Sequence, residues 1–460
     1  MSFDNDPPEL HDDDEARGRR WMATLREAIA AGDAARLTEL LEPLHAADIA
    51  DLIEQISPDE RDALLALWSG EIDGEILSEL DEAIRDEVIA RLPRNVLEDA
   101  VRELDSDDVV DLIEDLEEPQ QSVILSALED ADRAAVEQAL SWPEYSAGRL
   151  MQREVVVAPE HWRVGEMIDF LRAEEWLPDQ FYHVILIDPA MHPVGYVTLG
   201  KLLSSRREVP LAELAEDSFR TVNVRDAEGD VAYLFNQYHL ISAPVVDESG
   251  RLVGVITIDD AMAVLDEEHE EDVLRMAGVS DEASLSDSVI EAAKGRAVWL
   301  LVNLGTAILA SVVIDLFAAS IDALVALAVL MPIVTSMGGN AGIQTVAVAV
   351  RAIATRDLTA GNALRVARRE VAVGALNGMV FGLLLALVAG VWFGVPMLAV
   401  VIGVAMLLTL VAAALGGIAI PILLDRAGVD PALASGPFVT TVTDIIGFFA
   451  FLGLATVVLL

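Results

Sequence analysis

The longest hydrophobic runs of the chain all lie in its last third. They are residues 297–320, 321–350, 371–424 and 431–460, and the third of these runs carries no formal charge. A helix needs about 20 largely apolar residues to cross the hydrocarbon layer of a membrane, so the third run is long enough for two crossings. Gly394-Val395-Pro396 offers the turn between them. The pattern predicts a transmembrane domain of five helices over residues 297–460.

Residues 17–140 show the spacing of short amphipathic helices with an internal repeat. Residues 48–53 (DIADLI) recur as residues 108–113 (DVVDLI). Short helical units that repeat on this scale bury their apolar faces against one another and form superhelical stacks. We therefore predict an all-helical, superhelical N domain over residues 17–140. Residues 1–16 lack the basic start and apolar run of a signal peptide and are expected to form a disordered acidic tail.

From about residue 143 the pattern changes to strands that alternate with helices. Residues 184–199 and 243–260 each indicate a strand, a tight turn at Asp or Gly, and a second strand that enters a helix. The second copy resembles the CBS domain, because Gly254, Thr257 and Asp260 fit its Gly-x-x-Thr-x-x-Asp ending. We predict an α/β pair, with a first CBS domain over residues 143–205 and a second over residues 206–268.

An acidic run follows the second CBS copy and leads toward the membrane portion. Residues 266–272 (DEEHEED) hold six carboxylates, and a helical pattern continues to Arg296, which predicts a connecting (plug) helix over residues 269–296. The carboxylates repel one another unless cations screen them. A divalent ion shared with a facing acidic surface would switch such a segment between two arrangements. A solvated helix face is the alternative.

Charge divides the chain at the same place as hydropathy. Residues 297–460 contain seven acidic residues and six arginines, whereas residues 1–296 contain 70 acidic and 24 basic side chains. This charge excludes nucleic acid as a partner, because one polyanion repels another. It fits carboxylates that bind cations, and it also fits adaptation to high salt, with which two lysines beside 28 arginines agree. The absence of cysteine excludes thiolate metal sites.

The arginines of the hydrophobic third predict its orientation. The segment between the second and third predicted helices holds Arg351, Arg356, Arg365, Arg368 and Arg369, whereas the loops near residues 321 and 395 have no basic residue. Positively charged loops stay on the cytoplasmic side of a membrane. We therefore expect a multi-pass protein of the plasma membrane, in contact with lipid, with its N-terminus and CBS domains in the cytoplasm and its C-terminus outside.

One carboxylate lies in the middle of the last predicted helix. Asp444 follows Thr440-Thr441-Val442-Thr443, and a charge at this depth costs about 3 kcal/mol. Such residues face a water-filled path or pair with another buried polar group. No arginine of these helices lies deep enough to pair with it, and the nearby hydroxyls suit an ion that keeps its hydration shell. We interpret Asp444 as a pore-lining residue; an Asp retained for packing is the alternative.

A second unusual segment lies in the second predicted helix. Residues 331–344 (MPIVTSMGGNAGIQ) combine Pro332 with three glycines, which would break or kink the helix and let backbones approach closely. The freed carbonyl oxygens, with the side-chain oxygens of Asn340 and Gln344, would suit Mg²⁺, which takes oxygen ligands and loses its water reluctantly. Tight helix packing alone is the alternative.

Asp430 begins the last predicted helix. Pro431 follows it, at the position that helix starts favour. Asp430 precedes Asp444 by 14 residues, which corresponds to about 21 Å along a helix axis. One carboxylate at the cytoplasmic mouth and another midway would mark a single cation path.

Taken together, these features resemble the MgtE-type magnesium transporters over nearly the whole chain. The most specific signatures are Pro332 with residues 338–344 (GGNAGIQ), and the helix that runs from Asp430 to Asp444. The resemblance implies Mg²⁺ uptake by a homodimer with a pore at its axis and hydrated Mg²⁺ held at Asp444. It also implies that Mg²⁺ between the N, CBS and connecting segments closes the pore when the ion is plentiful inside.

The same resemblance assigns candidate site residues by position. The sensor candidates are Asp260, Glu268, Glu271 and Asp272, and the pore candidates are Asp444, Asp430 and Asn340. Acidic residues of the N domain are expected to face the CBS pair, but too many qualify for one to be chosen. In CBS pairs that bind adenosine nucleotides, the Thr and Asp of the ending contact the ribose. Thr257 and Asp260 are therefore candidate ATP ligands, although the first copy has Lys201 in place of the Asp.

The sequence does not indicate an enzyme, because it contains no nucleophile–base constellation and no phosphate-binding loop. Another transport interpretation stays open. It is a Mn²⁺ or Co²⁺ transporter on the same scaffold, regulated mainly by adenine nucleotide at the CBS pair. Asp444 alone does not separate Mg²⁺ from these ions, and the choice between a channel and a coupled carrier stays open too.

Overall fold

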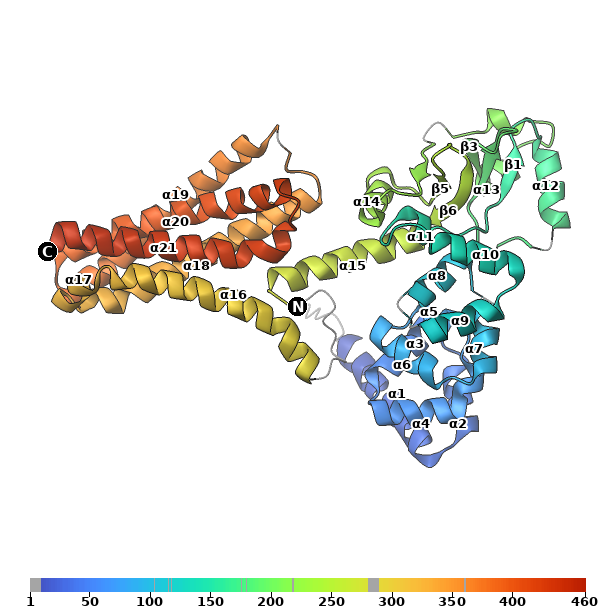
Figure 1. The fold of residues 1–460 in the computed structure, drawn as a ribbon, viewed down its shortest axis with the longest axis horizontal. Coiled ribbons are helices and arrows are strands. Elements are labelled where there is room, and N and C mark those ends of the chain that lie inside the picture. The colour runs from blue at the N-terminus through green and yellow to red at the C-terminus, as the bar shows by residue number, and fades with distance from the viewer. Residues whose placement is uncertain are drawn as a thin grey trace, which may run out of the picture. The chain divides into compact units, whose positions relative to one another are not determined.

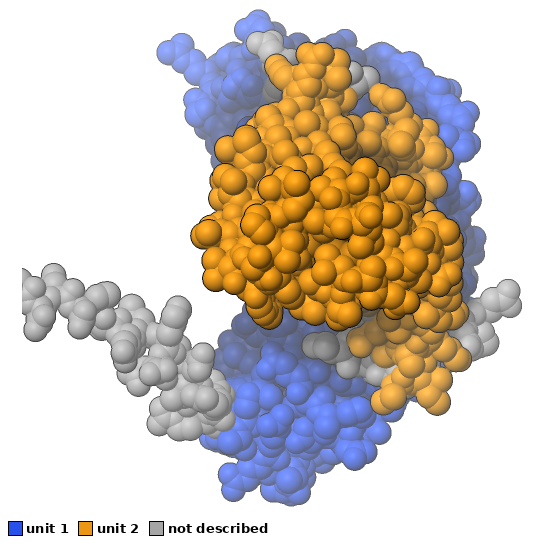
Figure 2. All heavy atoms as spheres, turned by 90° about the vertical axis from the view of Figure 1, so that its left-hand side faces the viewer, with its two compact units in different colours: residues 1–265 blue, residues 266–460 orange. Residues whose placement is uncertain are grey.

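The structure is a computed structural model that describes residues 10–102, 104–114, 116, 118–174, 176–178, 180–216, 219–279, 289–359 and 361–460. The chain divides into two compact units, residues 1–265 and residues 266–460, which Figure 2 shows in different colours. The helical domain and the CBS pair belong to the first unit, and the membrane helices belong to the second (Figure 1).

The first unit begins with a series of short helices. They are α1 (Leu10–Ala31), α2 (Ala34–Leu41), α3 (Ala46–Gln55), α4 (Pro58–Trp68), η1 (Ser69–Glu71), α5 (Gly74–Ser78), α6 (Glu82–Arg91), α7 (Arg94–Val101), α8 (Ser106–Glu114), α9 (Glu118–Ala127) and α10 (Asp130–Ala139). The all-helical N domain is confirmed. Helix α1 begins at Leu10, and the disordered acidic tail over residues 1–16 stays a prediction. Residues 1–9 lie outside the described residues.

The two copies of the sequence repeat fall on separate helices of one core. Residues 48–53 lie in α3 and residues 108–113 lie in α8. The equivalent apolar positions are buried in both helices, namely Ile49 and Ile53 in the first and Val109 and Ile113 in the second. These side chains belong to a single hydrophobic cluster that extends through the whole domain. The repeat therefore marks helices that stack through their apolar faces.

Two buried arginines link successive layers of this stack. Arg61 in α4 donates to the carbonyl oxygen of Ile53 at 3.0 Å and pairs with Glu87 in α6 at 2.7 Å. Arg85 in α6 pairs with Asp111 in α8 in the same way. Each acidic partner lies 26 positions after its arginine. The second pair fixes α8, whose first turn enters the site described below.

The CBS pair contains two three-stranded sheets of the same topology. The strands are β1 (Val157–Pro159), β2 (His183–Ile187) and β3 (Pro193–Thr198), then β4 (Val222–Asn223), β5 (Ser242–Val246) and β6 (Leu252–Thr257); the accompanying helices are α11 (Ala147–Leu150), α12 (Val164–Ala173), α13 (Leu199–Ser204), η2 (Leu211–Glu213) and α14 (Glu228–Tyr238). In each sheet the first strand runs parallel to the second, and the second runs antiparallel to the third. Both predicted copies are therefore confirmed as equivalent folds.

Helix α15 (Ile258–Met276) starts directly after β6 and carries the whole acidic run. The prediction of one connecting helix over residues 269–296 is thereby corrected. The helix begins 11 residues earlier, and it ends near Gly278, whose positive φ of 73° closes the last turn. Helix α16 (Val289–Asp315) begins a separate element, and the residues from 280 to 288 lie outside the described part of the chain.

Among the described residues, five helices are long and apolar enough to cross a membrane. They are α16, α18 (Ala326–Ala354), α19 (Ala363–Phe393), α20 (Pro396–Arg426) and α21 (Pro431–Leu459). The short helix α17 (Ala318–Ala323) precedes α18, so the second crossing begins at Ala326 and not at residue 321. The predicted number of helices is confirmed. The predicted turn falls at Gly394, which has a left-handed backbone and ends α19.

Small residues bring α19 and α20 into close contact. Three glycines recur at every fourth position of α19, and an added Cβ would lie 2.7 Å from the carbonyl oxygen of Leu410 at Gly374 and equally close to that of Gly403 at Gly382. At the middle glycine, Gly378, it would lie 2.9 Å from a backbone atom of α20. Such a stripe lets two membrane helices pack backbone to backbone. By contrast, α16 leaves large apolar side chains such as Leu301 and Leu304 exposed, which suits contact with hydrocarbon.

Candidate ion path and acidic clusters

Asp444 lies in α21 with its side chain half-buried, and within the described residues it makes no hydrogen bond or ion pair. The hydroxyl groups before it donate to the helix backbone, Thr440 to the carbonyl of Gly436 at 3.0 Å and Thr441 to that of Pro437 at 2.6 Å. Because each hydroxyl gives its proton to the helix, its oxygen lone pairs remain acceptors. This stretch of α21 therefore presents oxygen atoms and one carboxylate inside the membrane portion.

The contacts between α21 and α18 define the surroundings of Asp444. Thr440, Asp444 and Gly447 are spaced so that they share one face of α21. An added Cβ at Gly447 would lie 3.7 Å from the methyl group of Thr335, and one at Gly339 would lie 4.0 Å from the methyl group of Thr440. Asp444 lies between these two contacts along its helix. Its face of α21 therefore borders the polar segment of α18 that the sequence singled out.

Asn340 occupies an exposed position on α18. Its amide nitrogen donates to the carbonyl oxygen of Ser336 at 2.9 Å, one helical turn earlier. Ser336 and Asn340 are both exposed and share a side of α18 that the described helices of this unit leave uncovered. The described contacts do not join Asn340 to Asp444. Asp444 thus lies on a face of α21 that borders α18, whereas Asn340 lies on an uncovered face of α18.

The segment 331–344 does not break its helix. Helix α18 runs unbroken through Pro332 and the three glycines, so the expected break that frees carbonyl oxygens is wrong. The close approach is confirmed: an added Cβ would lie 2.5 Å from the side chain of Val439 at Gly342 and 2.6 Å from that of Thr409 at Gly338. These glycines admit α20 and α21 against α18, and neighbouring helices make an internal proline tolerable in a membrane. Tight packing, the alternative interpretation, accounts for them.

Asp430 caps the first turn of α21 and binds an arginine. Its Oδ1 accepts from the backbone N–H of Ala432 at 2.7 Å, and its Oδ2 pairs with Nη1 of Arg275 in α15 at 2.9 Å. Nη2 of Arg275 pairs with Glu271, one turn earlier in α15, also at 2.9 Å. The structure therefore brings together two predicted site residues, Glu271 and Asp430, through an arginine that sequence reasoning missed. The signal was a basic residue four positions after Glu271, the spacing of a helical ion pair.

Asp272 belongs to the same cluster, whereas Glu268 does not. Burial, followed by the negative charge of Asp430, raises the pKa of the Asp272 carboxyl group above its ordinary value. Glu268 is exposed in the middle of α15 and makes no hydrogen bond or ion pair with another described residue. The predicted sensor run is therefore divided, with its last two members near the start of α21.

A second acidic cluster lies in the first unit, where α8 meets the start of α15. Burial raises the pKa of Asp107 well above its usual range, and the charges of Asp260 and Asp108 add to this effect. Burial and then the charge of Asp260 raise the pKa of Asp108 to about 7. Burial is also the main cause that raises the pKa of Asp260 to about 6. Asp107 and Asp108, together with Asp105, are thus N-domain carboxylates that lie near Asp260 of the second CBS copy.

Asp260 and Thr257 are joined by two hydrogen bonds. The carboxylate of Asp260 accepts from the hydroxyl of Thr257 at 2.7 Å and from its backbone N–H at 3.3 Å, which caps the first turn of α15. In the first copy, Thr198 caps α13 by accepting from the backbone N–H of Lys201 at 3.3 Å, and Lys201 pairs with Glu216 at 2.8 Å. The motif of each copy therefore caps the N-terminus of the helix that follows it.

The segment that follows α11 holds the first turn of α8 in place. Glu154 accepts from the hydroxyl of Ser106 at 2.9 Å, and that hydroxyl in turn accepts from the backbone N–H of Arg153 at 2.8 Å. At the other end of α8, Glu114 pairs with Arg149 at 2.6 Å. These bonds position Asp107 and Asp108 against the CBS pair. No pattern in the sequence indicates these bonds, because the partners lie 35 to 48 positions apart.

The two acidic clusters are open groups of carboxylates. Within the described part of the chain, no three or more His, Asp or Glu side chains are arranged to hold a metal ion among them.

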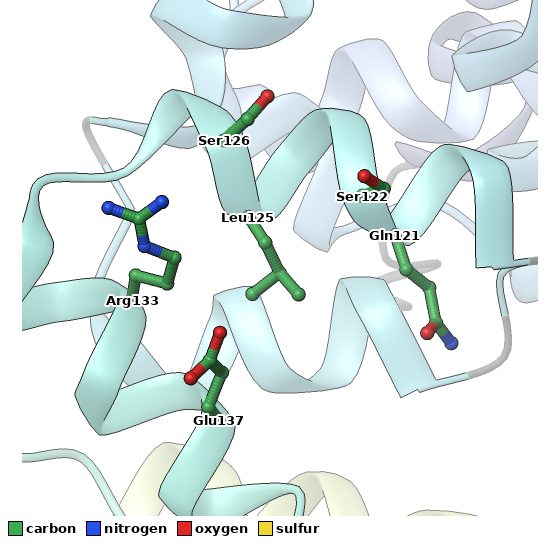
Figure 3. A pocket seen from close by; sticks show the side chains of 6 residues that line it. All are labelled: Gln121, Ser122, Leu125, Ser126, Arg133 and Glu137. Carbon is green, nitrogen blue, oxygen red and sulfur yellow. The ribbon is translucent and has the colours of Figure 1, made fainter.

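One hollow of about 450 Å³ lies on the N domain. Figure 3 shows Gln121, Ser122, Leu125 and Ser126 of α9 on one side and Arg133 and Glu137 of α10 on the other. Arg133 already pairs with Asp130 at its own helix start. The hollow contains none of the predicted site residues.

The fold and these sites define a multi-pass membrane protein that combines a CBS pair with a carboxylate-bearing membrane bundle. The MgtE family model, described as a divalent cation transporter, matches residues 331–454; the MgtE intracellular N domain matches residues 44–145, and the CBS domain matches residues 212–267. The chain belongs to the MgtE family of magnesium transporters. The resemblance noted from the sequence is confirmed, and the family is one of transporters and not of enzymes.

The relatives cover most of the chain. The magnesium transporter MgtE of Thermus thermophilus is 33% identical over 446 residues, which are 96% of this chain and 99% of that protein. MgtE of Enterococcus faecalis is 32% identical over 70% of this chain and 71% of its own length. A crystal structure of the cytosolic domain of the Mg²⁺ channel MgtE in complex with ATP has a TM-score of 0.49 at 30% identity and covers 53% of this chain and 99% of that one.

Proposed function

We propose that this chain is a Mg²⁺-selective channel or transporter for magnesium uptake, which closes when cytoplasmic Mg²⁺ binds its acidic N, CBS and connecting segments. The observation that carries the proposal is Asp444. It is a half-buried carboxylate inside a membrane helix, without a counter-charge among the described residues. Such a charge is costly in hydrocarbon unless it faces water or a cation. Membership of a magnesium transporter family supports Mg²⁺ as that cation.

The proposed path begins at Asp430 and passes Asp444. Asp430 lies at the start of α21, and Asp444 lies in its middle beside hydroxyl oxygens. A hydrated Mg²⁺ ion would bind these groups through its own water. The uncovered side of α18 that carries Ser336 and Asn340 supports a homodimer, in which two copies would line one axial pore and supply two Asp444 carboxylates for one divalent charge.

Two groups of carboxylates are the proposed sensor. Asp107, Asp108 and Asp260 form the first, at the contact between the N domain and the CBS pair. Glu271 and Asp272 form the second, beside Asp430; Glu268, which is exposed between them, would be the weakest contributor. A divalent ion would relieve the repulsion within each group and draw its two helices together. This mechanism requires the acidic portion to be cytoplasmic and the C-terminus to be outside, as the arginine distribution predicts.

ATP is a proposed second ligand of the CBS pair. Thr257 and Asp260 are the candidate ribose-binding groups, and in this structure the hydroxyl of Thr257 donates a hydrogen bond to Asp260. ATP bound there would take Asp260 away from the cluster with Asp107 and Asp108, so nucleotide and the docked N domain would compete for one carboxylate. Separate titrations of ATP and Mg²⁺ against protease protection of residues 143–295 distinguish the two ligands.

The central test is uptake by Asp444 variants. We expect Asp444→Ala and Asp444→Asn to abolish Mg²⁺ entry into proteoliposomes and growth of a Mg²⁺-auxotrophic strain, with membrane insertion intact. Phe449→Ala is the matched control, because Phe449 lies on the same helix with its side chain exposed. Full uptake by Asp444→Ala would overturn the proposed path. Parallel assays with Mn²⁺ and Co²⁺ establish which ion the path selects.

A further inference from the structure

Arg275 joins the end of α15 to the start of α21. One guanidinium nitrogen pairs with Asp430 and another with Glu271, both at 2.9 Å. The side chains of Arg275 and Asp430 are 23% and 30% exposed, so the pair is partly shielded from water. Close by, an added Cβ at Gly436 of α21 would lie 3.8 Å from the carbonyl oxygen of Met276. The last turn of α15 therefore rests against the first turns of the proposed pore helix.

The charge on Arg275 is permanent. A guanidinium stays protonated at every physiological pH and binds carboxylates in a fixed planar geometry. Its attraction to Asp430 needs no bound metal ion, unlike the attraction that a bound divalent cation supplies. Contact between the two helices thus has one component that is always present.

Among the described residues, the printed ion pairs of this cluster set one guanidinium, that of Arg275, against the carboxylates of Glu271 and Asp430, and Asp272 lies beside them. The excess of negative charge pushes α15 from α21 and leaves a place where a divalent cation adds attraction. Arg275 and the cation would therefore both draw α15 toward α21.

We propose that Arg275 is a gating residue: it latches the connecting helix to the pore helix without Mg²⁺ and so sets how much cytoplasmic Mg²⁺ is needed to close the path. This inference rests on the proposed function, since it assumes that docking of α15 on α21 closes the pore. The latch holds the helix near its docked position, and Mg²⁺ supplies the remaining attraction. Without the latch, docking depends wholly on the ion.

Disulfide trapping measures the latch directly. The chain contains no cysteine, so Met276→Cys with Gly436→Cys gives one defined pair. Gly436 has space for a side chain, because among the described residues the nearest atom outside its own helix is the carbonyl oxygen of Met276, at 3.8 Å from an added Cβ. The full-length protein carrying this pair is reconstituted in liposomes, and the rate of oxidative cross-linking is measured in chelator and in saturating Mg²⁺.

We expect Arg275→Gln to slow cross-linking in chelator about tenfold, the size of effect that a partly exposed charged hydrogen bond produces. Saturating Mg²⁺ should restore the rate, and Arg275→Lys should lie between the two, because lysine keeps the charge but not the planar fork. Arg426→Gln is the matched control, since Arg426 is exposed at the end of the preceding helix.

If the Arg275→Gln variant cross-links in chelator at the same rate as the wild type, the proposed latch is overturned. If Arg275→Gln slows cross-linking but Mg²⁺ has no effect on any variant, the latch stands and the proposed Mg²⁺ sensing is overturned. Uptake assays at low internal Mg²⁺ confirm that the variant is folded, because an undocked but intact pore conducts.

Discussion

Asp108 of α8 and Asp260 of α15 share one buried acidic cluster. Burial and then the charge of Asp260 raise the pKa of Asp108 to about 7, and burial above all raises the pKa of Asp260 to about 6. The contact between α8 and α15 is therefore most stable when protons or a cation neutralise these carboxylates. The hydrogen bonds of Ser106 and Glu154 hold α8 there against the remaining repulsion.

We expect the first unit to lose stability as the pH rises in metal-free buffer. The raised pKa values mean that the folded state binds more protons than the unfolded state between about pH 4 and pH 7, so the free energy of unfolding falls through this window. Thermal unfolding in chelator should occur at a lower temperature at pH 8 than at pH 5.5. Mg²⁺ should remove most of this difference. Equal stabilisation by Mg²⁺ at both pH values would contradict the cluster as the cation site.

Asp108→Asn should stabilise the same contact at pH 8 in chelator. Asparagine carries no charge, so both the cost of burying the Asp108 carboxylate and its repulsion by Asp260 are removed; a pKa raised by roughly three units corresponds to up to about 4 kcal/mol. The variant should unfold at a higher temperature than the wild type and gain less from added Mg²⁺. Asp132→Asn, at an exposed position of α10, is the control and should behave like the wild type. A lower unfolding temperature for Asp108→Asn would show that its charge is needed for folding.

The sequence was sufficient for the architecture because the signals that carry it are local. Hydrophobic runs of membrane length predicted five crossings, and alternating strands with the Thr257–Asp260 ending predicted the CBS copies. The bounds of the helices were harder to predict, because a single residue can decide where a helix ends. Gly278 ends α15 through its left-handed backbone, and nothing in the acidic run before it indicates a stop.

The sites were predicted only where one residue stands out from its surroundings. Asp444 and Asp430 are isolated carboxylates in apolar sequence, so their positions were evident. Asp107 was hidden among many acidic residues, because only the fold decides which of them is buried. Arg275 was missed because its role depends on a residue 155 positions away. For Gly342 the sequence left a helix break and tight packing both open, since the helices that pack against it are not visible in the sequence.

Gly342→Ala should disrupt the membrane bundle. An added Cβ would lie 2.5 Å from the side chain of Val439, and overpacking of this kind costs about 1–3 kcal/mol. We expect a lower unfolding temperature in detergent and reduced uptake. Gly305→Ala in α16 is the control, because nothing lies within 4 Å of its Cβ position. If both variants unfold at the wild-type temperature, α18 and α21 are less closely packed than the structure indicates.

Arg61→Ala should destabilise the N domain far more than Arg36→Ala. Arg61 is buried and donates to the carbonyl of Ile53, so its removal leaves a buried acceptor without a partner at a cost of about 1–3 kcal/mol. Arg36 pairs with Glu39 at an exposed site, where such pairs contribute about 0–1 kcal/mol. Hydrogen exchange of α4 and α6 in the full-length protein measures the difference. Similar exchange in both variants would mean that the carbonyl of Ile53 finds another donor when Arg61 is absent.

Asp272 and Glu268 should differ in their effect on closure, although both belong to one acidic run. Asp272 is half-buried beside Asp430, and burial with that charge raises its pKa, so a cation bound there relieves a real repulsion. Glu268 is exposed, where water already screens its charge. In patch-clamp recordings with stepwise cytoplasmic Mg²⁺, Asp272→Asn should need several-fold more Mg²⁺ for shut-off, whereas Glu268→Gln should match the wild type. Neutralising Glu268, Glu271 and Asp272 together should leave transport active at high Mg²⁺. Normal shut-off of that triple variant would exclude the connecting segment as a sensor and leave the cluster around Asp260 to sense the ion alone.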